Sequence, residues 1–265
     1  MLCKRCGKNN ALVEDGLCAR CADEAFGTLT AAPGPDPVPD EPGPPRPVPG
    51  PGWGVPLSPN GLAAAVTVLL GVVIAADLFA VVTGVLEYRF AADLLADGWK
   101  GRSEADLDRL DDLYALAGAA QLFTYVAAGI AFVVWFSRVR HNGEVFAPDG
   151  HSKARPWVLF GFVVPIANLW FPRRIALDIA QASAVEGRGV RRQIECWWFL
   201  WLANQTVTWF MEAWYESAER LPDIKDATGA VVLADLLDIV SAVFAIAFVR
   251  ALTGLQNRKV AHAHA

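Results

Sequence analysis

The sequence predicts an all-α integral membrane protein with about four to five transmembrane helices, one of which is a short or re-entrant segment broken by proline. A small metal-binding knuckle precedes these helices. Three observations support this fold class. Of the 265 residues, 54% are hydrophobic and only 19% are charged, whereas a soluble domain carries about 25% charged residues. Several apolar stretches reach the ~20 residues that cross a bilayer. Four of the five cysteines lie within the first 21 residues.

Residues 1–26 contain two Cys-x2-Cys pairs, formed by Cys3 with Cys6 and by Cys18 with Cys21. Each pair can place two thiolates on one ion, and two pairs complete a tetrahedral zinc site. Because so short a segment cannot bury a core, a structural Zn²⁺ would supply most of its folding free energy. The four cysteines resemble those of zinc ribbons. Two disulfides, an iron site and a fortuitous cluster are the alternatives.

Residues 27–60 are predicted to form a disordered, proline-rich linker. Twelve of the thirty residues from 31 to 60 are proline, which excludes regular helix and sheet because proline lacks the backbone N–H. A chain of this composition behaves as a semi-rigid spacer that rises about 3 Å per residue. The linker would therefore hold the zinc-ribbon-like module away from the membrane.

The remaining chain is predicted to form a multi-pass membrane domain over residues 61–252, followed by a tail over 253–265. Four stretches are long enough to span a bilayer, namely 61–86, 114–136, 194–215 and 231–252. Ahead of the second stretch, Ser103 and Asp106 match a capping box. One helix should therefore begin near Glu104 and continue directly into the membrane.

Orientation follows the distribution of lysine and arginine among the connectors. Residues 87–113 and 216–230 contain more acidic than basic side chains, whereas 137–156 and 172–193 contain more basic ones. The first two connectors are therefore predicted to lie outside the cell. The other two would lie inside, together with the N-terminus and the C-terminus. Four cysteines in a reducing cytoplasm favour a metal site over disulfides.

The apolar stretch 157–171 has 15 residues, which makes about 22 Å of helix and is short of a hydrocarbon core of ~30 Å. Pro165 interrupts it, and both of its flanks are basic. We therefore predict a re-entrant or interfacial helix–break–helix. Asn168 is expected to cap backbone carbonyls freed by the break, and contact with a substrate is the alternative role. The chain should continue past Pro172 into an amphipathic helix that ends near Val185. The rival is a fifth, short and tilted span, which would place the C-terminus outside.

Four acidic residues are candidates for an ion or proton site, namely Asp77, Glu212, Asp235 and Asp238. The last two lie one helical turn apart on one face, and no lysine or arginine is expected at the same depth. Ionisable groups in a membrane are costly and face a bundle interior or water. They predict a protonatable or cation-binding vestibule. Alternatively, three are hydrated near the interface and Asp77 is protonated or hydrogen-bonded. Hydrogen bonds between helices are expected from a polar belt of Asn204, Gln205, Thr206 and Thr208.

Two segments, "WFSRVRHNGEVFAP" and "RPWVLFGFVVPIANLWFPRRIALDIAQAS", are followed by a tryptophan-rich helix. In this order they resemble a bacterial membrane-protein family catalogued as domain of unknown function 4328. The matching residues are Trp135, Arg138, Asn142, Trp157, Gly161, Pro165, Asn168, Leu169, Trp170 and Pro172. The resemblance covers roughly 61–252 and implies a multi-pass membrane domain, without implying any activity.

The function classes that remain are not enzymatic, because the chain contains no familiar catalytic or nucleotide-binding motif. The net charge of −5 gives no reason to expect nucleic acid as a partner. The leading hypothesis is a scaffold or sensor in the cell membrane, whose zinc-binding module docks a cytoplasmic protein. The alternative is a small cation- or proton-linked transporter or channel that uses the intramembrane acidic residues.

Overall fold

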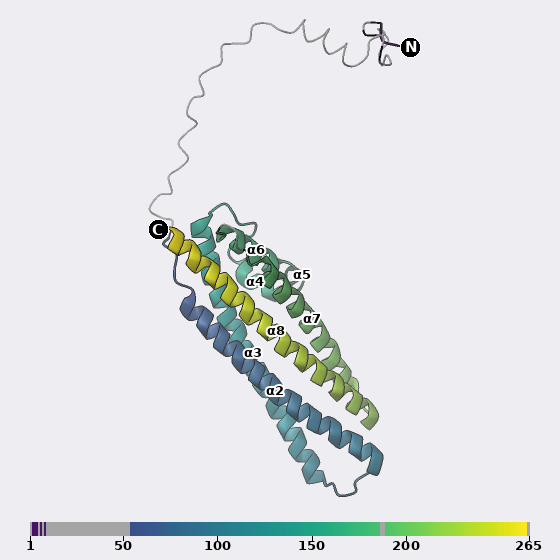
Figure 1. Ribbon diagram of the computed structural model, residues 1–265. Coiled ribbons are helices and arrows are strands. Elements are labelled where there is room, and N and C mark those ends of the chain that lie inside the picture. Colours follow the sequence, from purple (N-terminus) through teal and green to yellow (C-terminus); the bar gives the residue numbers. More distant parts are fainter. Residues whose placement is uncertain (1, 5, 7, 9–53, 186–188, 264–265) are drawn as a thin grey trace. The chain divides into compact units, whose positions relative to one another are not determined.

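The computed structural model describes residues 2–4, 6, 8, 54–185 and 189–263 (Figure 1). The chain divides into two units, Met1–Gly52 and Trp53–Ala265. In the first unit, Cys3 is buried and Cys6 is exposed. Cys18 and Cys21 lie outside the described residues, as does the proline-rich stretch up to residue 53. The predicted zinc-ribbon-like module and most of the predicted linker therefore stay predictions.

The described part of the second unit is built from helices of very different lengths. They are α2 (Asn60–Asp97), α3 (Glu104–Phe146), α4 (Trp157–Val163), α5 (Pro165–Asn168), α6 (Phe171–Ala182), α7 (Arg191–Ser217) and α8 (Leu221–Ala263). Helix α2 packs along both α3 and α8, and α7 packs along α8. Side chains of α3 also reach α8 and α7, so the four long helices form one bundle (Figure 1).

Three helices, α2, α3 and α8, are long and apolar enough to cross a membrane. Their large apolar side chains that face outward include Leu122, Phe123, Ile130, Leu233 and Val243, as expected of helices in contact with lipid. Helix α7 has 27 residues and is long enough as well. It is not among the three because its tryptophans and its polar belt lower its hydropathy. A crossing by α7 stays a prediction.

The N-terminus of α3 confirms the predicted capping box. The Ser103 hydroxyl accepts a hydrogen bond from the Asp106 N–H at 3.3 Å, and the Asp106 carboxylate accepts one from the Ser103 N–H at 3.0 Å. Helix α3 then runs unbroken for 43 residues, or about 65 Å. It is more than twice as long as a bilayer core requires, so its first turns extend beyond the hydrocarbon.

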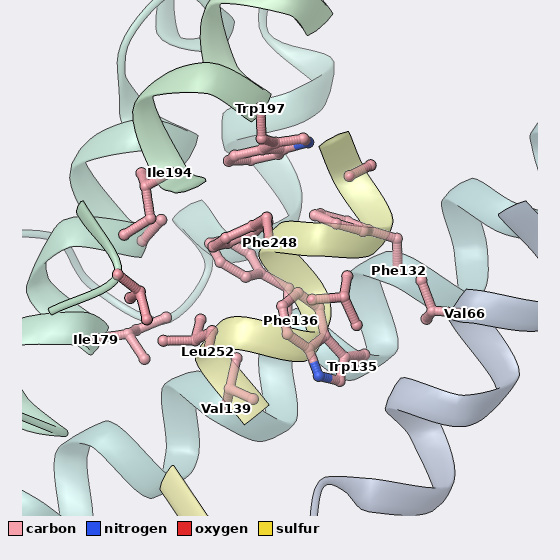
Figure 2. Packing of buried hydrophobic residues seen from close by; sticks show 14 of the residues in the cluster. Val66, Phe132, Trp135, Phe136, Val139, Ile179, Ile194, Trp197, Phe248 and Leu252 are labelled. Atoms are coloured by element: carbon pink, nitrogen blue, oxygen red, sulfur yellow. The ribbon is translucent and has the colours of Figure 1, made fainter. Parts of the chain in front are cut away.

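The main hydrophobic core takes side chains from α2, α3, α4, α6, α7 and α8 (Figure 2). The Trp197 ring stacks on Phe248 with centroids 4.4 Å apart, and Trp135 meets the edge of Phe248 at 5.6 Å. The Trp135 Nε1–H donates to the Thr253 hydroxyl at 3.0 Å. Ile179 of α6 is fully buried in the same cluster. Helix α6 is thus part of the core, although it is too short to span.

The segment from 157 to 171 folds back on itself. Helix α4 ends at Val163, Val164 is extended, and α5 begins at Pro165. The rings of Trp157 and Phe171, at the two ends of the segment, are only 4.7 Å apart, which excludes the straight path of a fifth span. The prediction of a helix–break–helix is therefore confirmed. Helix α6 has Pro172 in its first turn and ends at Ala182, three residues before the predicted end.

The last residues of the predicted linker lie against the helical domain. The Asn142 side chain of α3 accepts a hydrogen bond from the Leu57 N–H and donates one to the Leu57 carbonyl, both at 2.8 Å. Its amide also donates to the Gln256 side chain at 2.9 Å. Gln256 in turn donates to the Val139 carbonyl at 2.8 Å. Because Asn142 and Gln256 are almost fully buried, this network fixes the start of α2 against α3 and α8.

Candidate functional site

The predicted acidic residues of the membrane domain are joined by a glutamine. The Gln121 side-chain amide of α3 donates one hydrogen bond to Asp77 of α2 at 3.1 Å and another to Asp235 of α8 at 2.9 Å. An amide NH₂ has two donors, so both are used here. Asp77 is 1% exposed. One side chain therefore holds two carboxylates between three helices.

Asp238 is held by a different partner one turn further along α8. The Asn204 side chain of α7 donates to one of its carboxylate oxygens at 2.7 Å. This bond confirms the predicted interhelical role of Asn204. A neighbouring residue of the belt, Gln205, accepts a hydrogen bond from the Tyr125 hydroxyl at 3.2 Å. Thr206 instead donates within its own helix, to the Leu202 carbonyl.

Glu87 is a buried acid that the sequence analysis assigned to an outer connector. In the structure it lies within α2, because that helix continues to Asp97. The Tyr215 hydroxyl of α7 donates to its carboxylate at 3.1 Å. The sequence offered one signal, namely that no proline or glycine separates Glu87 from the apolar run before it. Helix α2 therefore presents two buried carboxylates, Asp77 and Glu87.

These carboxylates lack basic partners in the described part of the chain. None of its ion pairs involves Asp77, Glu87, Asp235 or Asp238. One buried oxygen of Asp77 and one of Glu87 have no hydrogen-bond partner in the protein. An uncompensated buried charge is costly. A protonated carboxyl is neutral and gains an O–H donor, so this arrangement suits groups that exchange protons.

Two cavities lie beside these residues. The first, which we call the acidic cavity, has a volume of about 280 Å³ and is lined by Tyr114, Gln121, Glu212, Tyr215, Glu216 and Asp235, among others. The second, the aromatic cavity, has a volume of about 310 Å³ and is lined by Tyr125, Phe132, Phe162, Asn168, Trp197, Trp201, Gln205 and Asp238, among others. The structure thus groups Glu212 with Asp235 and places Asp238 in the neighbouring cavity.

The two cavities follow one another along the same helices. On α3 the lining passes from Gln121 to Tyr125, which is one helical turn. On α8 it passes from Asp235 to Asp238, again within one turn. Asp77 contacts Gln121 at this same level. Asp77 and Asp235, which Gln121 bridges, therefore lie at the boundary between the two cavities.

Asn168 has a different role from the predicted one. Within the residues described, its side chain makes no hydrogen bond to the carbonyls freed by the break, and its Oδ1 is buried without a partner. Instead, Asn168 lines the aromatic cavity. The prediction that it caps the break is therefore wrong. Pro165 and Pro172 each stand in the first turn of a helix, where the missing N–H costs nothing.

A metal site does not form from these acids. In the described ranges of the chain, no three histidine, cysteine, aspartate or glutamate side chains come close enough together to hold a metal ion. Asp77, Asp235 and Asp238 are spread over two helices and are separated by amide side chains.

Comparison with known proteins gives one match. The family model described as "Domain of unknown function (DUF4328)" matches residues 100–254. This range holds α3 to α7 and most of α8, whereas α2 with Asp77 precedes it. No curated protein and no solved structure matches the chain. Because the matched range exceeds half of the sequence and includes the broken segment around Pro165, the chain belongs to the DUF4328 family of membrane-helix proteins with no assigned function.

Proposed function

We propose that the helical domain is a small proton-linked membrane transporter, in which Asp77, Asp235 and Asp238 take up and release protons. The observation that carries this proposal is the Gln121 amide, which bridges Asp77 and Asp235 where two cavities meet. Buried acidic residues without basic partners mark proton and substrate pathways in membrane proteins. This proposal corresponds to the alternative that the sequence predicts, a small cation- or proton-linked transporter.

Protonation would change the bonding of this bridge. With both carboxylates charged, Gln121 donates to each of them. When one carboxyl is protonated, its O–H becomes a donor and can use the carbonyl oxygen of the glutamine amide. The bridge therefore has two bonding arrangements, and each connects α2, α3 and α8 differently. A proton could thereby bias the packing of three helices, which is the requirement for coupled movement.

Proteoliposomes that contain the purified protein and an internal pH dye test this proposal. A panel of organic solutes is applied, and we expect at least one of them to drive a proton flux through the wild type. Asp77→Asn should abolish this flux, whereas Asp226→Asn, which removes an exposed acid of α8, should retain it. A flux that survives in Asp77→Asn, or a wild type that moves no protons with any solute, contradicts the proposal.

A second candidate function is the scaffold or sensor, in which Zn²⁺ bound to Cys3, Cys6, Cys18 and Cys21 stabilises a module that docks a cytoplasmic protein. The bonds between Leu57 and Asn142 support it, because they fix the end of the predicted linker, directly ahead of α2, against the membrane domain. Deletion of residues 1–53 separates the two functions and spares these bonds. A scaffold should lose its partner in affinity capture from membranes, whereas a transporter should keep its flux.

The cytoplasmic location of both termini belongs to this proposal and is supported by the basic connectors 137–156 and 172–193. Metal analysis of the purified full-length protein should find one zinc per chain, and substitution of Cys18 and Cys21 by serine should remove it. A reporter fused to the C-terminus should be active only on the cytoplasmic side. An extracellular signal would reverse the assigned orientation.

A further inference from the structure

We infer that the aromatic cavity binds a small lipophilic organic ammonium ion, whose nitrogen pairs with Asp238 and whose apolar part lies among aromatic rings. This inference names the substrate class of the proposed transport. Movement of this ligand across the membrane rests on the proposed function. Binding of the ligand is argued from the cavity alone.

Four aromatic rings that line the cavity contact one another. Phe162 of α4 meets Trp201 edge to face, with centroids 6.1 Å apart and planes at 89°. Phe132 lies 5.5 Å from Trp197 and 5.9 Å from Phe162. All four residues line the cavity. Clustered aromatic faces attract cations, and tryptophan does so most strongly. They also accept the apolar groups attached to an amine.

The carboxylate of Asp238 supplies the charge for such a ligand. One of its oxygens accepts the hydrogen bond from Asn204, and the other makes no hydrogen bond within the described residues. No lysine or arginine of the described part forms an ion pair with it. Asp238 is half-buried, and a carboxylate inside a membrane is costly without a counter-charge. A bound ammonium group would provide that counter-charge, which gives the site a preference for cations.

The remaining polar atoms of the cavity also favour a positively charged ligand. The Oδ1 atom of Asn168 is buried and has no partner, so it offers a second acceptor. Gln205 already accepts from Tyr125 through its Oε1 atom. A cavity with two unused acceptors and no lysine or arginine in its lining disfavours anions. Its volume of about 310 Å³ lies at the small end of ligand pockets, which favours a compact aralkylamine over a large dye.

The neighbouring acidic cavity gives a matched comparison. Asp235 stands one turn from Asp238 on α8 but lines the other cavity, where its carboxylate is bonded to Gln121. The same substitution at the two positions therefore removes one carboxylate inside the aromatic cavity and one beside it. A ligand held by general negative charge would respond equally to both changes. A ligand held by Asp238 responds to one.

The test measures binding to full-length protein in nanodiscs, by tryptophan fluorescence and by calorimetry, with empty nanodiscs as the blank. The probes are phenethyltrimethylammonium and 3,3-dimethylbutylbenzene, which have the same shape but differ in charge. We expect the cation to bind the wild type. Asp238→Asn should lower the affinity for the cation by about tenfold or more. Asp235→Asn should change its affinity less than about threefold, and Asp238→Glu should bind it more tightly than Asp238→Asn.

A second variant guards against a misfolded Asp238→Asn protein. Trp201→Leu keeps an apolar side chain but removes an aromatic face. It should therefore weaken binding of the cation and leave binding of the uncharged probe unchanged. Equal affinity of the two probes for the wild type overturns the inference, because the cavity would then be a site for an apolar chain such as that of a lipid. Unchanged cation affinity in both Asp238→Asn and Trp201→Leu overturns it too.

The outcomes also separate this inference from the proposed function. Cation binding that depends on Asp238, without any proton flux in proteoliposomes, supports the site and contradicts the transporter. A proton flux driven by other solutes, together with no binding of phenethyltrimethylammonium, supports the transporter and overturns the site.

Discussion

The two halves of the helical bundle satisfy their buried groups in different ways. Around Phe248 the rings of α3, α7 and α8 are in contact, and the nearby polar groups of Trp135, Asn142 and Gln256 have protein partners. Around Asp77 the helices enclose two cavities, and buried oxygens lack partners. We call these regions the packed half and the cavity half. The first has the features of a region that maintains the fold, and the second contains the residues to which we assign the proposed function.

The largest effect should come from the packed half. Phe248→Ala removes the ring that stacks on Trp197 and leaves a cavity in the main cluster. We expect the free energy of unfolding to fall by about 3–5 kcal/mol, measured by chemical denaturation in detergent. Phe123→Ala is the control, because that ring is 73% exposed and should cost far less. Equal losses in the two variants would remove the distinction between core and lipid-facing surface.

The attachment of the N-terminal segment should have the next largest effect. Asn142→Ala leaves the Leu57 N–H and carbonyl and the Gln256 amide without their partner, which should cost about 1–3 kcal/mol. Hydrogen exchange at the Leu57 amide should accelerate as well. Asn257→Ala, which breaks only an exposed bond to Asn60, should change neither quantity. An unchanged Leu57 amide would show that the bond to Asn142 does not hold this segment.

The cavity half should respond in the opposite sense. Asp77→Asn keeps an acceptor for Gln121 and removes a charge that has no basic partner. The free energy of unfolding should stay within about 1 kcal/mol of the wild type or increase. Proton flux should nevertheless disappear. A loss as large as that of Phe248→Ala would assign Asp77 to the structural framework and erase the contrast between the two halves.

The smallest effect should come from the helix start at Ser103, outside both halves. Hydrogen bonds from the side chain and the backbone of Ser103 lower the pKa of Asp106. The stability from this cap is therefore present above the ordinary pKa of aspartate, near 4, and is lost as pH falls through the lowered value. Ser103→Ala should raise exchange of the first amides of α3 at neutral pH. The difference between the two proteins should become smaller as pH falls through the lowered pKa, because the bonds to the Asp106 carboxylate are then lost and only the bond from the Asp106 N–H to the Ser103 hydroxyl remains.

Local rules in the sequence predicted the parts of this fold that depend on neighbours in the chain. The start of α3 follows from Ser103 and Asp106, and the break follows from Pro165. The bundle of four long helices follows from the length of the apolar stretches. Helix α7 is rich in tryptophan, whose indole ring has a low hydropathy. That composition explains why a membrane crossing by α7 is still only a prediction.

The candidate site could be predicted only in part. The four acids were identified by their place in apolar stretches, but their grouping was not. Gln121 is an ordinary polar residue in the sequence, and its two partners lie 44 and 114 positions away. Asp178 is a charged residue of the helix that the sequence predicts to be amphipathic, and such a residue would ordinarily lie on the exposed face. It is 3% exposed and accepts hydrogen bonds from the Ser152 N–H and hydroxyl. Both facts depend on packing between distant segments.

The spacing of Asp235 and Asp238 has a consequence for how little the bundle would have to move. Three residues of an α-helix correspond to about 60° around the axis and about 4.5 Å along it. A screw displacement of α8 of that size would carry one carboxylate to the place of the other, and with it from one cavity to the next. Such a step is smaller than one helical pitch, and the contacts of Phe248 and Gln256 on the same helix would oppose it.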